Sequence, residues 1–337
     1  MQHPLSGRPK AQPSGVIETL SAGYTAVNRQ LWVLALPILL DLFLWLGPRV
    51  SYSPLTDPVV VQAAEVTRQV ALVSGRDARG PDVLNRLGGV DASRQWMLAR
   101  ADDVNGLSAL AWSPIALPSL RNVPSTTDEL AFVSGWPDGL MLLAASAGLG
   151  LLLGGWFYAG LASASTGRRG GPVSAGRSTP RAVVDVLGLI GVLVGLAVLL
   201  GLPVVVLIGF TWLVSPPVAV LGSVLVGAGV LFAGLHLFFA VPAIFVSSAG
   251  PLAAIQHSVA IVRRHLRPSL ALILLTWLIL AGMAQVWGVL GDTLQSPYGV
   301  ALSIFGNAYI ASGLIAAGMI FYTQRTEPLA PGAANPS

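Results

Sequence analysis

Long runs of apolar residues without charge constrain this chain more than any other feature. The run from Gly139 to Ala162 contains no charged side chain, and five further runs are nearly as apolar. A helix needs about 20 mostly apolar residues to cross the hydrocarbon core of a bilayer. The sequence therefore predicts an all-α polytopic membrane helix bundle with about six transmembrane helices. The runs are residues 31–47, 139–162, 182–214, 217–247, 269–291 and 298–323.

Composition supports lipid as the solvent of this chain. Only 10% of the residues are charged, whereas soluble domains carry about 25%. The net charge of +4 is spread between the apolar runs, which disfavours nucleic-acid binding because that function needs a clustered basic face. The absence of cysteine excludes disulfides and thiolate chemistry. We expect the lipid bilayer as the main partner, no nucleic acid and no cofactor.

Basic residues alternate between the connections of these runs. The connections after the second and fourth runs contain arginines, whereas those after the third and fifth contain no Lys or Arg. Under the positive-inside rule this alternation predicts six spans with the N-terminus and C-terminus in the cytoplasm. Lys10 is the only lysine among 19 basic residues, which is typical of GC-rich bacterial genomes and suggests a bacterial cytoplasmic (inner) membrane.

These features divide the chain into five regions. Residues 1–30 and 325–337 are expected to be disordered cytoplasmic ends. Residues 31–48 form the first transmembrane helix and residues 139–324 form helices 2–6. Residues 49–138 are soluble in composition and predict a small helical cap outside the membrane, without strand periodicity. Within this cap, the apolar stretch 107–120 is expected to lie on the membrane surface or on the bundle.

Two helices show patterns of their own. The run 182–214 corresponds to roughly 50 Å of helix against a core of about 30 Å, so either Gly201 and Pro203 kink it or its first turns lie at the membrane interface. Residues 251–265 predict an amphipathic helix along the cytoplasmic interface, with an apolar stripe formed by Leu252, Ile255, Val259 and Val262.

Small residues spaced four apart favour close contact between helices. Packing inside the bundle is the expected role of these pairs, and homodimerisation is the alternative. The pairs are Gly150 with Gly154, Gly191 with Gly195, and Gly313 with Ala317. His236 lies within the fourth run and is expected to be a neutral histidine that shares a hydrogen bond with a neighbouring helix.

Asp41 is the most informative polar residue, because it interrupts the first run. A carboxylate facing lipid at mid-span costs about 2.5–3.5 kcal/mol, so Asp41 is predicted to face the bundle interior. Its depth below the outer end of its span matches that of Gln285 and Asn307, at about 10 Å. We predict an intramembrane polar cluster of Asp41, Gln285 and Asn307.

The cluster of Arg263, Arg264 and Arg267 permits three interpretations. Juxtamembrane arginines set topology, they attract anionic lipid headgroups, and they could also dock a cytoplasmic partner. All three interpretations place this cluster on the cytoplasmic side.

Enzymatic motifs are missing from the chain. No histidine is followed by the residues of HExxH, no GxSxG occurs, and Lys10 cannot complete a phosphate-binding GxxxxGK[ST] loop. Catalytic, cofactor and metal sites are therefore not expected. We expect a non-enzymatic accessory or scaffold protein of unknown molecular function. A transporter or permease subunit is the alternative, although the spans contain few of the polar residues that line a solute path.

Three short segments resemble known membrane proteins. The stretch from Leu36 to Trp45 and the tripeptide Pro118-Ser119-Leu120 resemble an uncharacterised group of bacterial six-helix membrane proteins. The tetrapeptide Ser248-Ala249-Gly250-Pro251, followed by Ser258, a basic cluster and a span, resembles the membrane domain fused to some glycerophosphodiester phosphodiesterases. This resemblance implies a six-helix membrane module over residues 24–324 and implies no activity.

Overall fold

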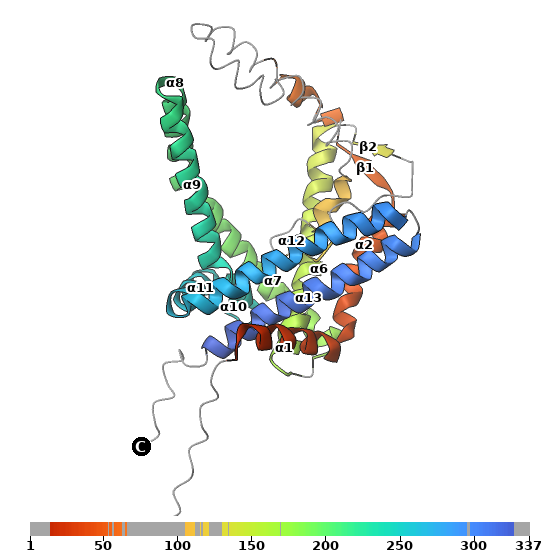
Figure 1. The fold of residues 1–337 in the computed structure, drawn as a ribbon. Coiled ribbons are helices and arrows are strands. Elements are labelled where there is room, and N and C mark those ends of the chain that lie inside the picture. Colours follow the sequence, from red (N-terminus) through yellow and green to blue (C-terminus); the bar gives the residue numbers. More distant parts are fainter. Residues whose placement is uncertain are drawn as a thin grey trace, which may run out of the picture. The chain divides into compact units, whose positions relative to one another are not determined.

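The computed structural model describes most of the chain outside its ends and the middle of the 49–138 insert. It covers residues 14–62 except 53 and 56, residue 65, residues 105–120 except 112–114 and 116, residues 130–168 except 134, and residues 170–294 and 297–326. These residues are helical almost throughout (Figure 1), which confirms the all-α class. They divide into two compact units. Unit 1 comprises residues 1–35 and 155–337, and unit 2 comprises residues 36–154.

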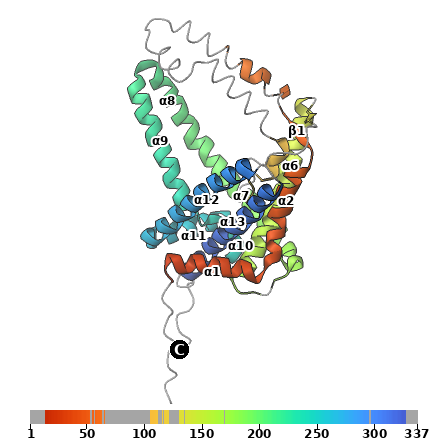
Figure 2. The same cartoon turned by 45° about the vertical axis from the view of Figure 1, so that its right-hand side comes forward.

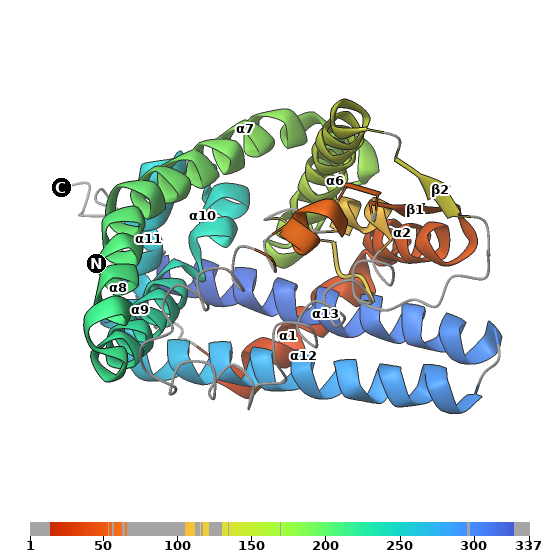
Figure 3. The same ribbon diagram turned by 90° about the horizontal axis from the view of Figure 1, so that it is seen from above.

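Unit 1 is an array of helices. Within it α12 and α13 run side by side (Figures 1 and 3). Its elements are α1 (Val16–Arg29), the 3-10 turn η1 (Leu31–Leu34), the end of α6 (Trp136–Ser165), α7 (Pro172–Leu196), the π-helical turn η3 (Ala197–Gly201), α8 (Leu202–Val214), α9 (Pro216–Leu237), α10 (Ala240–Ser247), α11 (Pro251–Arg264), α12 (Leu266–Leu294) and α13 (Pro297–Thr326).

Unit 2 contains α2 (Ala35–Leu46), the first part of α6, the 3-10 segment η2 (Gly106–Ala111) and two short strands. Strand β1 (Arg49–Ser51) pairs in parallel with β2 (Leu130–Phe132), with Val50 opposite Ala131. The strands join the two ends of the insert, where the chain leaves α2 and enters α6. The sequence shows no strand periodicity here, because three residues are too few to show the alternation that identifies a strand.

Five described helices are long and apolar enough to cross a membrane, by length and composition. A sixth is obtained if α1 and the segment Leu31–Leu46 count as one span, although the two are bent by 90°. The count agrees with the prediction of about six spans. The first span is the weakest, since Leu31–Leu46 alone is shorter than about 20 residues.

The long third run lies in one continuous helical path from Pro172 to Trp212. This path contains a π-helical turn. The π-helical turn Ala197–Gly201 ends two residues before Pro203. Proline has no N–H and its ring clashes with the carbonyl four residues earlier, so a π-helical turn at this point relieves the conflict. This irregular turn lies where Gly201 and Pro203 were expected to act, and a kink of the helix axis at that point stays a prediction.

Helix α1 corrects the prediction that residues 1–30 are disordered, at least from Val16 to Arg29. The Glu18 carboxylate accepts a hydrogen bond from the Gly15 N–H at 2.9 Å, which satisfies a free donor at the helix start. Ser14 donates to Gln324 Oε1 at 2.8 Å and joins the start of α1 to the end of α13. The polar, glycine-containing composition concealed a short helix that tertiary contacts stabilise.

Glycine contacts explain how closely α1 approaches α13 (Figure 2). A Cβ atom on Gly23 would lie 2.4 Å from the Gly313 carbonyl oxygen and 2.7 Å from the Ala317 nitrogen. The predicted internal packing of the Gly313–Ala317 pair is confirmed, with α1 as the partner. The pair Gly191 and Gly195 does not pack in this way, because a Cβ on either residue meets no atom within 4 Å.

Candidate functional site

Asp41 lies inside α2 of unit 2 and is completely buried. The Ser119 hydroxyl donates a hydrogen bond to Asp41 Oδ1, and the Leu120 N–H donates to Oδ2 at 3.2 Å. Both partners come from the end of the 105–120 segment, almost 80 residues away in sequence. A carboxylate that accepts two hydrogen bonds offsets part of the cost of its burial. Asp41 therefore holds a non-helical segment against α2.

The 105–120 segment also lies along α6 in unit 2. Its side chains Leu110, Ile115 and Leu117 are buried. A Cβ on Gly150 would lie 2.3 Å from the Leu110 carbonyl oxygen, and one on Gly154 would lie 2.1 Å from that of Ile115. The segment thus packs on the helices, one of the two positions that the sequence allowed.

This contact corrects the prediction for Gly150 and Gly154. The pair was expected to bring two long helices together, and it instead admits the backbone of the short 3-10 segment η2 at Leu110 and of the turn at Ile115. The segment therefore contacts α6 as far as Gly154, which lies roughly 27 Å from the start of the helix at Trp136, at 1.5 Å per residue. Non-helical backbone beside apolar spans is tolerated where protein groups satisfy it, as Asp41 does for the Leu120 N–H.

Gly150→Ala should destabilise unit 2, because the added methyl group overlaps a backbone carbonyl that has no rotamer with which to escape. Overpacking of this kind costs about 1–3 kcal/mol. The measurement is the free energy of unfolding by reversible denaturation in mixed micelles. Gly148→Ala is the matched control on the same helix, since a Cβ there meets nothing within 4 Å. Equal stability of the two variants would contradict the packing.

Gln285 and Asn307 were predicted to join Asp41. Gln285 is exposed on α12, Asn307 is half-buried on α13, and neither forms a hydrogen bond within the described part of the chain. Both lie in unit 1, whereas Asp41 lies in unit 2. Their pairing with Asp41 stays a prediction. Sequence reasoning missed Ser119 as a partner, although a polar residue after a proline within an apolar stretch was an available signal.

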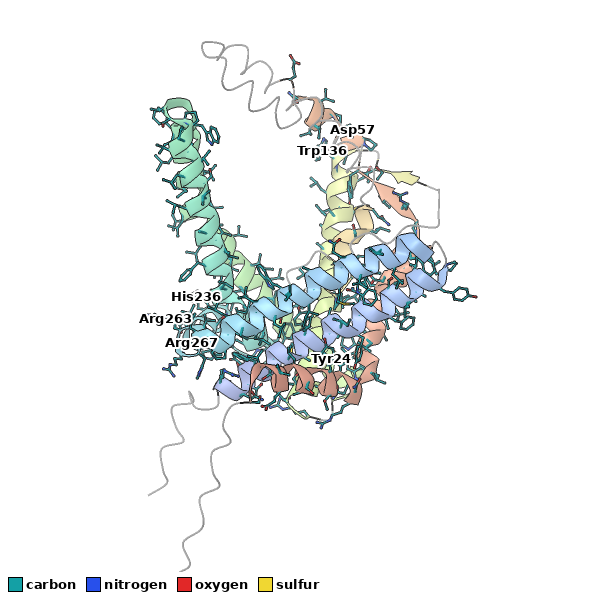
Figure 4. All side chains as sticks on the ribbon, in the orientation of Figure 1. Tyr24, Asp57, Trp136, His236, Arg263 and Arg267 are labelled. Atoms are coloured by element: carbon teal, nitrogen blue, oxygen red, sulfur yellow. The ribbon has the colours of Figure 1, made fainter. Side chains whose placement is uncertain are left out.

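The three arginines of the second predicted cluster are exposed where α11 meets α12. Arg263 and Arg267 lie at the same end of unit 1 (Figure 4). Arg263 and Arg264 end α11, where cations complement the negative end of the helix dipole. Their positive charges are therefore available to a ligand or partner.

The buried face of α11 differs from the predicted stripe. Ala254, Ser258, Ile261 and Val262 are buried, whereas Leu252 is 63% exposed. The reason is a hydrogen-bonded contact that apolar periodicity cannot reveal. Ser258 Oγ accepts the Phe239 N–H at 3.0 Å and donates to the His236 carbonyl, at the break between α9 and α10. Small residues on this face allow α11 to approach that break.

His236 itself bonds within its own helix. Its Nδ1 lies 2.9 Å from the Phe232 carbonyl oxygen, and its ring packs on the Phe232 ring at 4.2 Å. The expected hydrogen bond to a neighbouring helix is therefore corrected to one within α9.

A second polar network joins α10, α11 and α13. The buried Tyr322 hydroxyl lies 2.8 Å from Ser247 Oγ and 3.0 Å from His257 Nδ1. Each of its members has a partner, which is what a structural clasp between helices requires.

Two arginines lie close enough to His265, between α11 and α12, to affect its protonation. Burial lowers the pKa of His265, and the positive charges of Arg325 and Arg264 lower the pKa further. The positive field of this junction therefore extends from the exposed arginines to the end of α13.

Comparison with known protein families, curated proteins and solved structures finds no significant match. The fold alone defines the class: this chain is an all-α polytopic helix bundle whose helices are long and apolar enough to cross a membrane.

Proposed function

We propose that this chain is a non-enzymatic accessory or scaffold protein of the bacterial inner membrane, with both termini in the cytoplasm. The basic and neutral alternation of its short connections supports this orientation. The observation that carries the proposal is the α8–α9 hairpin.

The α8–α9 hairpin offers an apolar surface that the rest of unit 1 does not cover (Figure 1). Only 6% of the most apolar window is buried in Pro172–Trp212 and in Pro216–Ser247, compared with 56% in α13. Phe210 and Leu225 are each 64% exposed. Lipid can cover such a surface. However, these two spans bury little of their surface against the rest of unit 1, which suits them to a contact with another membrane protein.

Filling the hairpin's open glycines tests this role. A Cβ on Gly209 or Gly227 meets no atom within 4 Å, so a side chain at either position starts in open space. Leucine would block the close approach of a partner helix. We expect Gly209→Leu and Gly227→Leu to abolish a complex that is isolated with the wild-type chain from its native membrane in lipid nanodiscs.

The control for this experiment is Gly148→Leu, which makes the same change at an open glycine of α6. It should leave the complex intact. The amount of inserted protein and its unfolding temperature should be unchanged in all three variants. A complex that survives both hairpin substitutions would show that the hairpin is not the contact surface.

A transporter or permease subunit is the second candidate. It is favoured by the buried carboxylate Asp41 beside a non-helical segment and by the break between α9 and α10, because solute sites often lie at interrupted helices. Loss of growth or solute uptake with Asp41→Asn, at unchanged protein level, would favour this candidate over the scaffold.

A further inference from the structure

The arginines at the α11–α12 junction lie in a long stretch of sequence without acidic residues. No Asp or Glu occurs between Val186 and Gly291. Within the described ranges, no carboxylate forms an ion pair with Arg263, Arg264 or Arg267. Three exposed guanidinium groups therefore carry positive charge that the described residues do not neutralise.

Arg325 adds a fourth, buried cation behind this surface. It is only 4% exposed, and its guanidinium carbon lies 3.4 Å from the centroid of the Phe321 ring. Its Nε and Nη1 atoms have no hydrogen-bond partner among the described residues. A buried cation stabilised by an aromatic face keeps its charge, and that charge adds to the potential at the junction because the screening of buried charges is weak.

An apolar stripe on α12 leads away from the arginines. Arg267 is followed at helical spacing by Ala271, Leu274 and Leu278, all on one face and all exposed. Leu274 and Leu278 are 60% and 68% exposed. The stripe extends about 16 Å from the charged end, at 1.5 Å per residue. A cationic head and an apolar track in line are complementary to a phospholipid.

We propose that this junction binds an anionic phospholipid, whose phosphate contacts Arg263, Arg264 and Arg267 while an acyl chain lies along Ala271, Leu274 and Leu278. Guanidinium groups suit this ligand because they donate paired hydrogen bonds to phosphate oxygens. The lipid site goes beyond the scaffold role and does not depend on it, since it requires only the purified chain and lipid.

The test is native mass spectrometry of the full-length chain with phosphatidylglycerol or phosphatidylcholine. The wild type should retain phosphatidylglycerol in preference to phosphatidylcholine. Each arginine near an anionic surface strengthens the binding of an anionic lipid about fivefold. Removing two arginines should therefore lower the preference for phosphatidylglycerol about 30-fold. The variant is Arg264→Gln with Arg267→Gln. The matched control is Arg177→Gln with Arg181→Gln, which removes two exposed arginines from α7 and should change nothing.

Single variants guard against misfolding of the double variant. Arg264→Gln and Arg267→Gln alone should each lower the preference about fivefold, with an unchanged unfolding temperature in phosphatidylcholine nanodiscs. An unaltered preference in these variants, or an equal loss in the α7 control, would overturn the proposal.

A competition arm separates a lipid from a free anion. Inorganic phosphate in excess should not displace phosphatidylglycerol, because it lacks the chain that occupies the α12 stripe. Displacement by phosphate alone would refute a lipid site. Equal retention of the two lipids by the wild type would also refute a lipid site. The arginine cluster would then serve to set topology or to bind an acidic protein partner.

Discussion

Asp41→Leu should destabilise the chain by about 2–4 kcal/mol, since it removes the acceptor of the Leu120 N–H and leaves the Ser119 hydroxyl only the Leu120 carbonyl oxygen at 3.5 Å. Each stranded polar group costs about 1–3 kcal/mol, and the partial burial of Ser119 sets its contribution near the lower end. The measurement is the free energy of unfolding in mixed micelles.

Asp41→Asn is the matched control for this prediction. The asparagine oxygen can accept from the Leu120 N–H, while its amide nitrogen donates to the Ser119 hydroxyl oxygen. The asparagine variant should therefore stay close to the wild type.

A double-mutant cycle then isolates the contact between Asp41 and Ser119. Ser119→Ala should add little to Asp41→Leu, because the hydroxyl that the leucine strands is no longer present. Strictly additive effects of the two substitutions would contradict the hydrogen bond. An unfolding free energy of Asp41→Asn as low as that of Asp41→Leu would show that the negative charge itself stabilises the fold.

Gly23→Ala should separate α1 from α13. The added methyl group would lie 2.4 Å from the Gly313 carbonyl oxygen and 2.7 Å from the Ala317 nitrogen, both backbone atoms that cannot rotate away. We expect a loss of about 1–3 kcal/mol from overpacking, which is large for a helix held by one face. Because the chain contains no cysteine, a single introduced cysteine can be labelled selectively to measure the separation of α1 from α13.

Maleimide labelling of Val27→Cys reports the separation, since Val27 is fully buried on α1. Labelling should be slow in the otherwise wild-type chain and fast when Gly23→Ala is added. Gly318→Ala on α13 is the control, because its Cβ would make an ordinary contact with Phe238 at 3.8 Å. Slow labelling in the Gly23→Ala background would mean that α1 is not held through this glycine.

The sequence by itself determined which segments are apolar helices and where the helical hydrogen bonding of one of them becomes irregular. The charge-free run at 139–162 lies within α6, and a π-helical turn precedes Pro203 in the long third run. These features depend on local chemistry. A helix of about 20 apolar residues satisfies its own backbone hydrogen bonds in lipid, and a proline disrupts the turn in which it lies.

The tertiary structure alone decided which segments meet. Asp41 was recognised as a residue that needs a partner, but Ser119 and Leu120 are more than 75 residues away. Gly150 was recognised as a contact residue, but a carbonyl of the short 3-10 segment η2 occupies the site where another transmembrane helix was expected. Likewise, α1 has too few apolar residues to be recognised as a helix from sequence, and its contact with α13 stabilises it. A hydrogen bond from the Phe239 N–H to Ser258 sets which face of α11 is buried. The need for a contact is a property of one segment, whereas the choice of partner depends on the free energies of contacts between distant segments.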